Sequence, residues 1–352
     1  MNDFLEPRDG LSSAGRYLSP QIDADVRLNA NESPLTPLVE PSIIEQLELN
    51  RYPDREAKTL REAIASQYEL SANQVFAANG SNEVIQTFLL TYGGPKRSVM
   101  IFSPTYVMHS KIAAITGTSV IDLKREKDFS LNADFVCEQI EKEKPELIFL
   151  CSPNNPTGAS DSEELPERIL KLLETYSGIL FIDEAYGEFT SSSFVSLVSE
   201  KRPLVISRTF SKAWGLAGLR LGYLLGPSWC IKEIENISLP YHLGAITQSV
   251  AVNAMKNLAS VENQADDIIR ERDRISEALK NLAVEVWPSE TNFILFRPTN
   301  MNATEVWEEL VSKSVLIRDF SKIEGLEGCL RVTIGTETEN NVFIEALEEI
   351  LR

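Results

Sequence analysis

From about residue 75 onward, short apolar runs alternate with amphipathic stretches. Five of the runs are continuously apolar, which is typical of strands that helices cover on both faces; they lie at residues 99–102, 147–150, 179–182, 204–206 and 223–225. Helical patterns separate several of them, notably at 161–177, where Ser160 and Glu163 predict a capping box. The alternation predicts an α/β fold with a mostly parallel, doubly wound sheet, whose ligands gather at the carboxyl ends of the strands.

The pattern changes after about residue 245. A charged, helix-like stretch at 249–281 is followed by shorter strand candidates and a final helix, at residues 284–287, 292–296, 315–318, 329–334 and 338–351. This part reads as an α+β unit, distinct from the large sheet.

Three parts of the chain follow from these patterns. Residues 1–40 are rich in turn-forming residues, and the first clear helix is expected at 55–69. We expect an N-terminal arm at 1–45 that joins the small domain, a large domain at 46–248 and a small C-terminal α+β domain at 249–352.

The charge balance limits the partners. With 52 acidic and 34 basic residues, the net charge of −18 should repel nucleic acid and anionic membranes, so we expect neither as a partner. Any phosphate or carboxylate site then needs locally placed cations. The start of the chain lacks the features of a signal peptide, and no apolar run approaches the roughly 20 residues that span a bilayer.

Cysteine and histidine usage points away from metal chemistry. Four widely spaced cysteines without a Cys-x-x-Cys pair favour a reducing, cytoplasmic location and give no support to disulfides or zinc. The two histidines, His109 and His242, lie in no suggestive motif, and each is expected to be structural or exposed. We therefore predict no metal.

Four polar clusters follow apolar runs, where the predicted sheet would place a ligand. The first, Ala-Asn-Gly-Ser-Asn-Glu at 78–83, opens a helical pattern and suits either a phosphate cradle or an ordinary helix cap. The second, Ser-Pro-Asn-Asn-Pro-Thr-Gly at 152–158, is either a plain turn or a rigid holder for an Asn amide. No Gly-x-Gly-x-x-Gly or Walker-type loop is present, so nucleotide binding lacks its usual support.

The third and fourth clusters carry charge. Asp183-Glu184-Ala185-Tyr186 follows a buried strand, where a carboxylate needs a cation; because adjacent strand residues point to opposite faces, Asp183 and Glu184 should not share a metal ion. Lys212 lies among small and hydroxyl residues with Arg220 eight positions later. A lysine near a second cation loses its proton more easily and then attacks carbonyls, although a solvated corner is the alternative.

Together the clusters offer an amine for an aldehyde, a carboxylate for a ring nitrogen, and an amide and a phenol for a ring oxygen. Hydroxyl groups and a guanidinium remain for a phosphate. Pyridoxal phosphate needs this set of partners. The combination is more specific than any of its parts.

The order of these motifs resembles the fold-type I, class II aminotransferases that use pyridoxal 5′-phosphate, and within them the histidinol-phosphate branch. The stretches at 28–34, 51–54, 317–319 and 328–336 support the resemblance, which covers the chain from about residue 26 to its end. One departure is Gly-Ser-Asn-Glu at 80–83, where the family more often has Gly-Ala-Asp-Glu. Which side chain of this turn contacts phosphate is therefore open.

The resemblance implies a role for each site residue. Lys212 would be the catalytic lysine that forms a Schiff base with the cofactor, Asp183 would hold the ring nitrogen protonated, and Arg331 would grip a substrate carboxylate. The other cofactor-binding residues would be Asn155, Tyr186, Tyr106, Gly80, Ser81, Asn82, Thr209, Ser211, Arg220 and, from a partner subunit, Tyr52. The other substrate-binding residues would be Arg318 and Asn31.

The activity so implied is a transamination between L-histidinol phosphate and 2-oxoglutarate in a homodimer with shared active sites, the large domain binding the cofactor. Two alternatives from the same family are threonine-phosphate decarboxylase and aromatic amino-acid aminotransferase. A third alternative is a non-enzymatic regulator that keeps the cofactor domain. Such regulators carry an added DNA-binding segment, for which we expect no room before residue 26.

Overall fold

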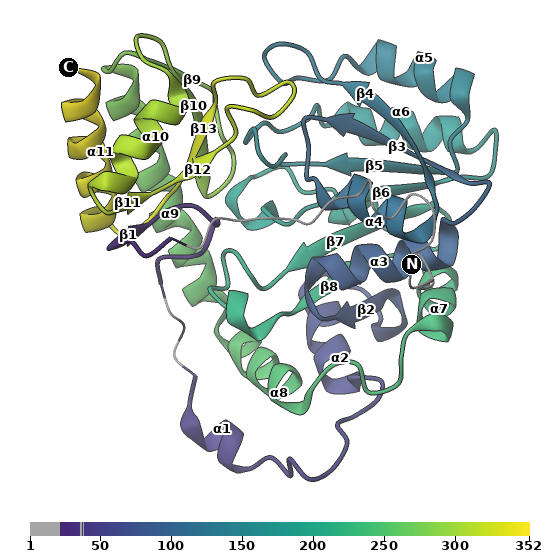
Figure 1. The fold of residues 1–352 in the computed structure, drawn as a ribbon. Helices are drawn as coiled ribbons and strands as arrows, with labels where there is room; N and C mark the ends of the chain where they lie inside the picture. Colours follow the sequence, from purple (N-terminus) through teal and green to yellow (C-terminus); the bar gives the residue numbers. More distant parts are fainter. Residues whose placement is uncertain (1–21, 36, 38) are drawn as a thin grey trace, which may run out of the picture.

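A seven-stranded sheet forms the centre of the larger part of the molecule, and the computed structural model describes residues 22–352 apart from 36 and 38 (Figure 1). The strand order is β2-β8-β7-β6-β5-β3-β4, and every neighbouring pair is parallel except the two that involve β8. The strands are β2 (Val75–Ala78), β3 (Ser98–Ser103), β4 (Ser119–Lys124), β5 (Leu147–Cys151), β6 (Ile179–Asp183), β7 (Leu204–Thr209) and β8 (Gly222–Leu225). The mostly parallel sheet predicted from the sequence is confirmed.

Helices cover both faces of this sheet. Alternate residues of β5 enter two different cores: Ile148 and Leu150 pack with α2, α5, α6 and α8, whereas Leu147 and Phe149 pack with α3, α4 and α7. The helices are α2 (Lys58–Gln67), α3 (Gly80–Tyr92), α4 (Met108–Thr116), α5 (Ala133–Glu143), α6 (Glu164–Leu173), α7 (Ser228–Ile237) and α8 (Ala245–Ala254). Burial on both faces is the physical reason for the continuously apolar strands.

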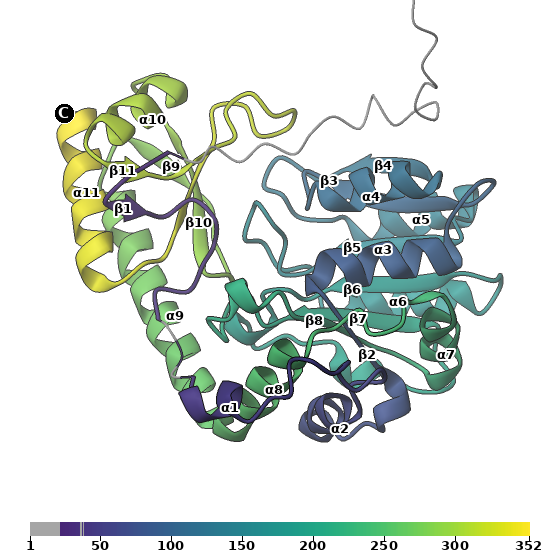
Figure 2. The ribbon, with the colours of Figure 1, turned by 60° about the horizontal axis from the view of Figure 1, so that its bottom comes forward.

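A second, antiparallel sheet of order β12-β13-β10-β9 lies beside the first (Figures 1 and 2). Its strands are β9 (Val284–Val286), β10 (Phe293–Pro298), β12 (Arg318–Asp319) and β13 (Leu330–Thr333). The helices that pack with it are α9 (Leu258–Lys280), α10 (Ala303–Ser312) and α11 (Glu337–Leu351). The core of this unit also takes in Val26 and Leu28 from the N-terminal segment.

The N-terminal segment connects the two units. β1 (Val26–Arg27) pairs in parallel with β11 (Val315–Leu316), and the short helix α1 (Pro41–Glu45) lies near α8 at the base of the molecule (Figure 2). The first 21 residues of the predicted arm lie outside the described residues. No helix in the described part of the chain is long and apolar enough to cross a membrane.

Several local predictions were wrong. The capping box does not form, because α6 begins at Glu164 and the Ser160 hydroxyl instead donates to Glu290 at 2.8 Å. The helix expected over 249–281 is broken into α8 and α9 by a 3-10 turn at Met255–Asn257. The strand expected at 315–318 is interrupted at Ile317, where β11 and β12 join different sheets.

Candidate functional site

A cavity of about 860 Å³ opens at the carboxyl ends of β5, β6 and β7 and is lined by residues of both units. Parallel strands bring their carboxyl ends to one edge, which places the polar clusters together. The predicted site residues that line the cavity are Asn31, Ser81, Asn82, Tyr106, Asn155, Asp183, Tyr186, Thr209, Ser211, Lys212, Arg220, Arg318 and Arg331.

Two predicted site residues are placed differently. Gly80, the first residue of α3, is not among the lining residues but lies directly before Ser81. Tyr52 is 80 % exposed, stacks on Tyr241 with ring centroids 4.5 Å apart, and does not line the cavity of its own chain. Within this chain, therefore, Tyr52 stands apart from the site.

Lys212 is one of the residues that line the cavity. Its Nζ donates to the main-chain carbonyl oxygens of Ala30 at 3.2 Å and Asn31 at 3.0 Å. Burial, followed by the positive charge of Arg331, lowers the pKa of the Lys212 amine to about 7. An amine with that pKa is substantially neutral at physiological pH, so it can act as a nucleophile and as a base.

Asp183 ends β6 and is almost completely buried. Its Oδ2 lies 3.0 Å from Nε2 of the equally buried His109, and its Oδ1 accepts from the Ala185 N–H at 3.1 Å. The Tyr106 and Phe149 rings meet the His109 ring edge-on. The carboxylate is thus fixed in orientation, and His109 has a specific partner that sequence analysis missed. The only sequence signal was the position of His109 three residues after Tyr106.

A chain of amides joins the two units across the cavity. The Tyr186 hydroxyl accepts from Asn31 Nδ2 at 2.8 Å and from Asn155 Nδ2 at 3.2 Å. The Asn155 Oδ1 in turn accepts from Arg331 Nη1 at 2.6 Å. Burial raises the pKa of the Tyr186 phenol, so this hydroxyl stays protonated. Asn155 therefore bridges the Tyr186 phenol and the Arg331 guanidinium and fixes the two groups relative to each other.

A cradle for an anion lies at the start of α3. Arg220 Nη1 donates to the Ser211 hydroxyl at 3.4 Å, and the Thr209 hydroxyl donates to the same oxygen at 3.0 Å. A Cβ on Gly80 would lie 2.5 Å from Arg220 Nη2, and Gly80 has φ +78°. Glycine therefore lets the helix N-terminus approach the guanidinium, and free N–H groups there suit a phosphate.

Glycine at 222 has a similar effect on the same turn of α3. A Cβ there would meet the Ser81 amide nitrogen at 2.4 Å. The absence of this atom lets β8 pack against the first turn of α3. In the same turn, Asn82 Oδ1 accepts from the Tyr106 hydroxyl at 2.9 Å, which fixes the Tyr106 ring at the cavity wall.

Two arginines approach from the small unit. Arg331 on β13 pairs in register with Arg318 on β12. The Phe320 ring lies 5.1 Å from the Arg331 guanidinium and 5.7 Å from that of Arg318. Arg331 also donates to the Asn29 carbonyl at 3.1 Å. Aromatic contacts and a carbonyl hold these cations at the cavity, where they suit a carboxylate or phosphate.

Asp183 and Glu184 diverge, as their positions on a strand predict. Asp183 lines the cavity, whereas Glu184 accepts from Arg208 Nη2 at 2.6 Å and Nε at 3.1 Å on the other side of β6. Both partners of this ion pair are buried. No group of three potential metal-ligating side chains occurs in the described residues.

The residues present fit the aromatic aldehyde phosphate expected from the sequence. The cavity combines the Lys212 amine, whose pKa is lowered to about 7, a fixed carboxylate at Asp183, and the hydroxyls and guanidinium beside α3. These groups match the aldehyde, the pyridine nitrogen and the phosphate of pyridoxal phosphate, respectively. The glycine at 80 lets the Arg220 guanidinium lie against the first turn of α3, where a phosphate would bind.

Known proteins are similar in sequence to this chain over nearly its whole length. A sequence model of the family described as aminotransferase class I and II matches residues 14–347. The chain belongs to this family. It is an aminotransferase of the fold-type I class with pyridoxal phosphate as cofactor, so the predicted fold class, enzyme class and cofactor are confirmed.

Individual relatives agree. This aminotransferase is 42 % identical over 357 residues to the histidinol-phosphate aminotransferase of Mycobacterium sp. (strain JLS), covering 97 % of this chain and 93 % of the relative. It is 37 % identical over 363 residues to that of Corynebacterium glutamicum (strain R), covering 99 % and 97 %.

Solved structures show the same fold. The histidinol-phosphate aminotransferase of Sinorhizobium meliloti, in complex with pyridoxal-5′-phosphate, superposes with a TM-score of 0.87 at 22 % identity, covering 99 % of this chain and 98 % of that one. The enzyme of the same name from Clostridium acetobutylicum gives 0.84 at 24 % identity, covering 92 % and 98 %. At these identities the likeness concerns the fold.

Proposed function

We propose that this aminotransferase moves an amino group between L-histidinol phosphate and 2-oxoglutarate, giving imidazole-acetol phosphate and L-glutamate in histidine biosynthesis. The observation that supports this proposal most directly is the cavity, which combines the Lys212 amine, with a pKa of about 7, with the cations Arg220 and Arg331. Curated relatives named for this activity, at 37–42 % identity, support the choice of substrate.

The cofactor would be held by the residues that the sequence singled out. Asp183 would pair with the ring nitrogen, and Asn155 and Tyr186 would bind the ring hydroxyl oxygen. The remaining contacts would come from Tyr106, Gly80, Ser81, Asn82, Thr209, Ser211 and Arg220. When bound, pyridoxal phosphate supplies an aldehyde for the amino group and a ring that accepts electron density from the substrate's Cα.

Lys212 would do the proton chemistry. With its Nζ free and neutral, Lys212 would take the proton from the substrate's Cα. Its pKa near 7 suits this work, because a general base is most effective when its pKa lies close to the working pH. Lys212 would then deliver this proton to the C4′ carbon of the cofactor, so it would act first as a base and then as an acid.

The substrates would be gripped from the small unit. Arg331 would bind the α-carboxylate of glutamate or 2-oxoglutarate through its fork of donors. Histidinol phosphate has no such carboxylate, so Arg318 and Arg331 would bind its phosphate. Asn31, whose amide bonds Tyr186, would lie against the substrate and connect its position to that of the phenol.

We also propose a homodimer in which Tyr52 of one subunit completes the phosphate site of the other. Tyr52 is exposed in its own chain and stacks on Tyr241, beside other exposed apolar residues such as Leu49 and Leu239. Such a surface would gain stability by being covered. A cytoplasmic location is proposed as well, because all four cysteines are free thiols.

The substrate assignment is tested with purified holoenzyme. Histidinol phosphate with 2-oxoglutarate should yield glutamate with a kcat/KM at least about tenfold above that for phenylalanine. Threonine phosphate should release no carbon dioxide. Preferred turnover of phenylalanine, or carbon dioxide from threonine phosphate, would replace the histidinol-phosphate assignment with that activity.

A further inference from the structure

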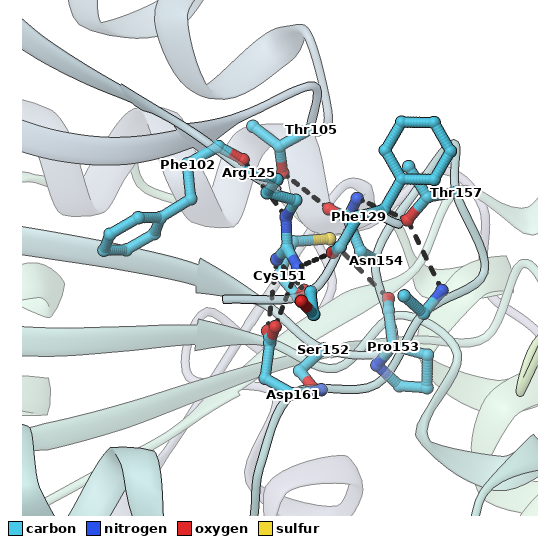
Figure 3. A network of polar contacts seen from close by, with 12 residues as sticks. Phe102, Thr105, Arg125, Phe129, Cys151, Ser152, Pro153, Asn154, Thr157 and Asp161 are labelled. Carbon is cyan, nitrogen blue, oxygen red and sulfur yellow. Dashed lines mark hydrogen bonds and ion pairs between the residues drawn. The ribbon is translucent and has the colours of Figure 1, made fainter. Parts of the chain in front are cut away.

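A buried ion pair lies behind the wall of the active site. Arg125, directly after β4, and Asp161, before α6, have side chains that are 0 % exposed, and two bonds of 2.7 Å and 3.1 Å join them (Figure 3). Neither residue lines the cavity. A buried charge pair of this kind costs desolvation energy, which its hydrogen bonds offset while they fix the groups that they join.

Arg125 connects three segments besides Asp161. Its guanidinium donates to the main-chain carbonyls of Phe102 at 3.3 Å, Phe129 at 3.0 Å and Cys151 at 3.4 Å (Figure 3). Phe102 belongs to β3 and Cys151 ends β5, so one side chain joins the carboxyl ends of both strands to the turn at Phe129. With the two bonds to Asp161, all five donors of the guanidinium are used.

The loop between β5 and α6 is bonded along its length. The Asp161 N–H donates to the Ser152 hydroxyl at 3.1 Å, which closes the loop on itself. Inside the loop, Asn154 Nδ2 donates to the Pro104 carbonyl at 3.0 Å, and Asn154 Oδ1 accepts from the Thr105 hydroxyl at 2.8 Å. In Figure 3 the Arg125 guanidinium faces the Asp161 carboxylate, and dashed lines join the two.

Asn155 and Pro156 are the residues of this loop that line the cavity, and Asn155 contributes the polar side chain. Asn155 donates to the Tyr186 hydroxyl and accepts from Arg331 at 2.6 Å. A shift of the loop would move this amide away from both partners. The direction of the Arg331 guanidinium, which would grip the substrate, therefore depends on where the loop lies.

We propose that Arg125 and Asp161 are positioning residues, which set the β5–α6 loop so that Asn155 aligns Arg331 for the substrate anion. The proposal rests on the proposed function in one respect, namely that Arg331 binds that anion. Lysine should not replace Arg125, because a single ammonium cannot serve a carboxylate and three separate carbonyls from one place.

The test measures binding rather than turnover, with glutarate as an unreactive dicarboxylate probe. Calorimetry of the holoenzyme should show that Arg125→Lys lowers the affinity for glutarate roughly tenfold. This is the scale of one charge-assisted hydrogen bond. Asn155→Ala should lower the affinity similarly. The double variant should be no worse than Asn155→Ala alone, because both changes act on the same contact.

Arg61→Lys is the matched control. Arg61 also bonds a carboxylate, Glu235 at 2.6 Å, and the Ala72 carbonyl, but it lies away from the cavity. This control should leave glutarate affinity within about twofold of wild type even where it lowers the melting temperature. If Arg125→Lys fails to fold, Asp161→Asn, which keeps the shape of the side chain, enters the same cycle in its place.

Two results would overturn the proposal: glutarate affinity unchanged in Arg125→Lys or Asp161→Asn, or effects that simply add to that of Asn155→Ala. Failure of the substrate assignment would give a different set of results. If wild type fails to turn over histidinol phosphate but the glutarate cycle is non-additive, the positioning role stands and the substrate assignment falls.

Discussion

The Nε2 atom of His109 lies 3.0 Å from Oδ2 of Asp183, and both side chains are buried. His109→Ala would remove one of the two contacts that orient this carboxylate, the other being the Ala185 N–H. We expect kcat to fall roughly tenfold, the scale of one hydrogen bond to a charged group. Steady-state kinetics checks this, and a kcat within twofold of wild type would show that Asp183 needs no such support.

The main outline of the fold follows from the sequence because its strands are buried on both faces. Leu147 to Leu150 are all apolar since each of them enters one of two cores. The edge strand β4 escaped prediction for the opposite reason: Val120 and Ile121 lie among polar residues on a largely exposed strand. The local sequence pattern predicts the central strands, which helices cover on both faces, but it does not predict an exposed strand at the edge of the sheet.

The site could be predicted only in part. Lys212 and Asp183 stand in recognisable motifs, and both line the cavity. The supporting contacts join residues far apart in sequence, such as Arg125 with Asp161 or His109 with Asp183, and nothing in either local sequence indicates its partner. Tertiary packing, which no local pattern encodes, creates these pairs.

The titration of Lys212 gives a prediction for the cofactor-free protein. Burial and the charge of Arg331 lower the pKa of this amine to about 7, and aldehydes react with the neutral form. Labelling of Lys212 by pyridoxal phosphate, trapped with borohydride and located by peptide mass spectrometry, should rise through pH 7 and then level off. In denaturing urea, labelling of the same lysine should have its midpoint near the ordinary lysine pKa of 10.5. A folded-state midpoint above pH 9 would contradict the account.

The same shift fixes the sign of a stability effect. Between about pH 7, where folded Lys212 loses its proton, and the ordinary pKa of 10.5, the unfolded chain binds more protons than the folded one. The contribution of this group to the free energy of unfolding should therefore rise with pH across that window. Lys212→Met, compared with wild type by urea unfolding of the cofactor-free proteins, should remove the rise.

Gly80 should tolerate a side chain poorly. Alanine there would hold a left-handed conformation and bring its Cβ 2.5 Å from Arg220 Nη2. We expect Gly80→Ala to lose about 1–2 kcal/mol of unfolding free energy and to bind pyridoxal phosphate more weakly. Gly244→Ala is the control, because a Cβ at Gly244 would have no heavy atom within 4 Å. Equal cofactor affinity in the two variants would remove Gly80 from the phosphate site.

The buried Glu184–Arg208 pair should matter for stability. Glu184→Ala leaves a buried guanidinium without its main carboxylate, which costs about 3–5 kcal/mol. Asp134→Ala, which breaks the solvent-exposed pair with Arg168, should cost at most about 1 kcal/mol. Urea unfolding of the cofactor-free proteins separates the two, and similar costs would show that the buried pair has no special role.

A shared site can be tested by mixing defective subunits. Tyr52→Ala and Lys212→Ala should each be nearly inactive alone. Co-expressed in equal amounts, they should form mixed dimers in which one site carries both changes and the other carries neither. Activity should then recover to about a quarter of wild type, because half of the dimers have one intact site. No recovery, or a monomeric mass by light scattering, would place Tyr52 outside the partner's site.

The most direct measurement is the turnover of Lys212→Ala. With histidinol phosphate, 2-oxoglutarate and saturating pyridoxal phosphate, glutamate formation should fall about 10²–10⁴-fold, the usual contribution of a positioned acid–base group. The cofactor absorbance band of wild type should be lost with it. Full turnover together with an unchanged absorbance band would contradict the assignment of Lys212 and the account built on it.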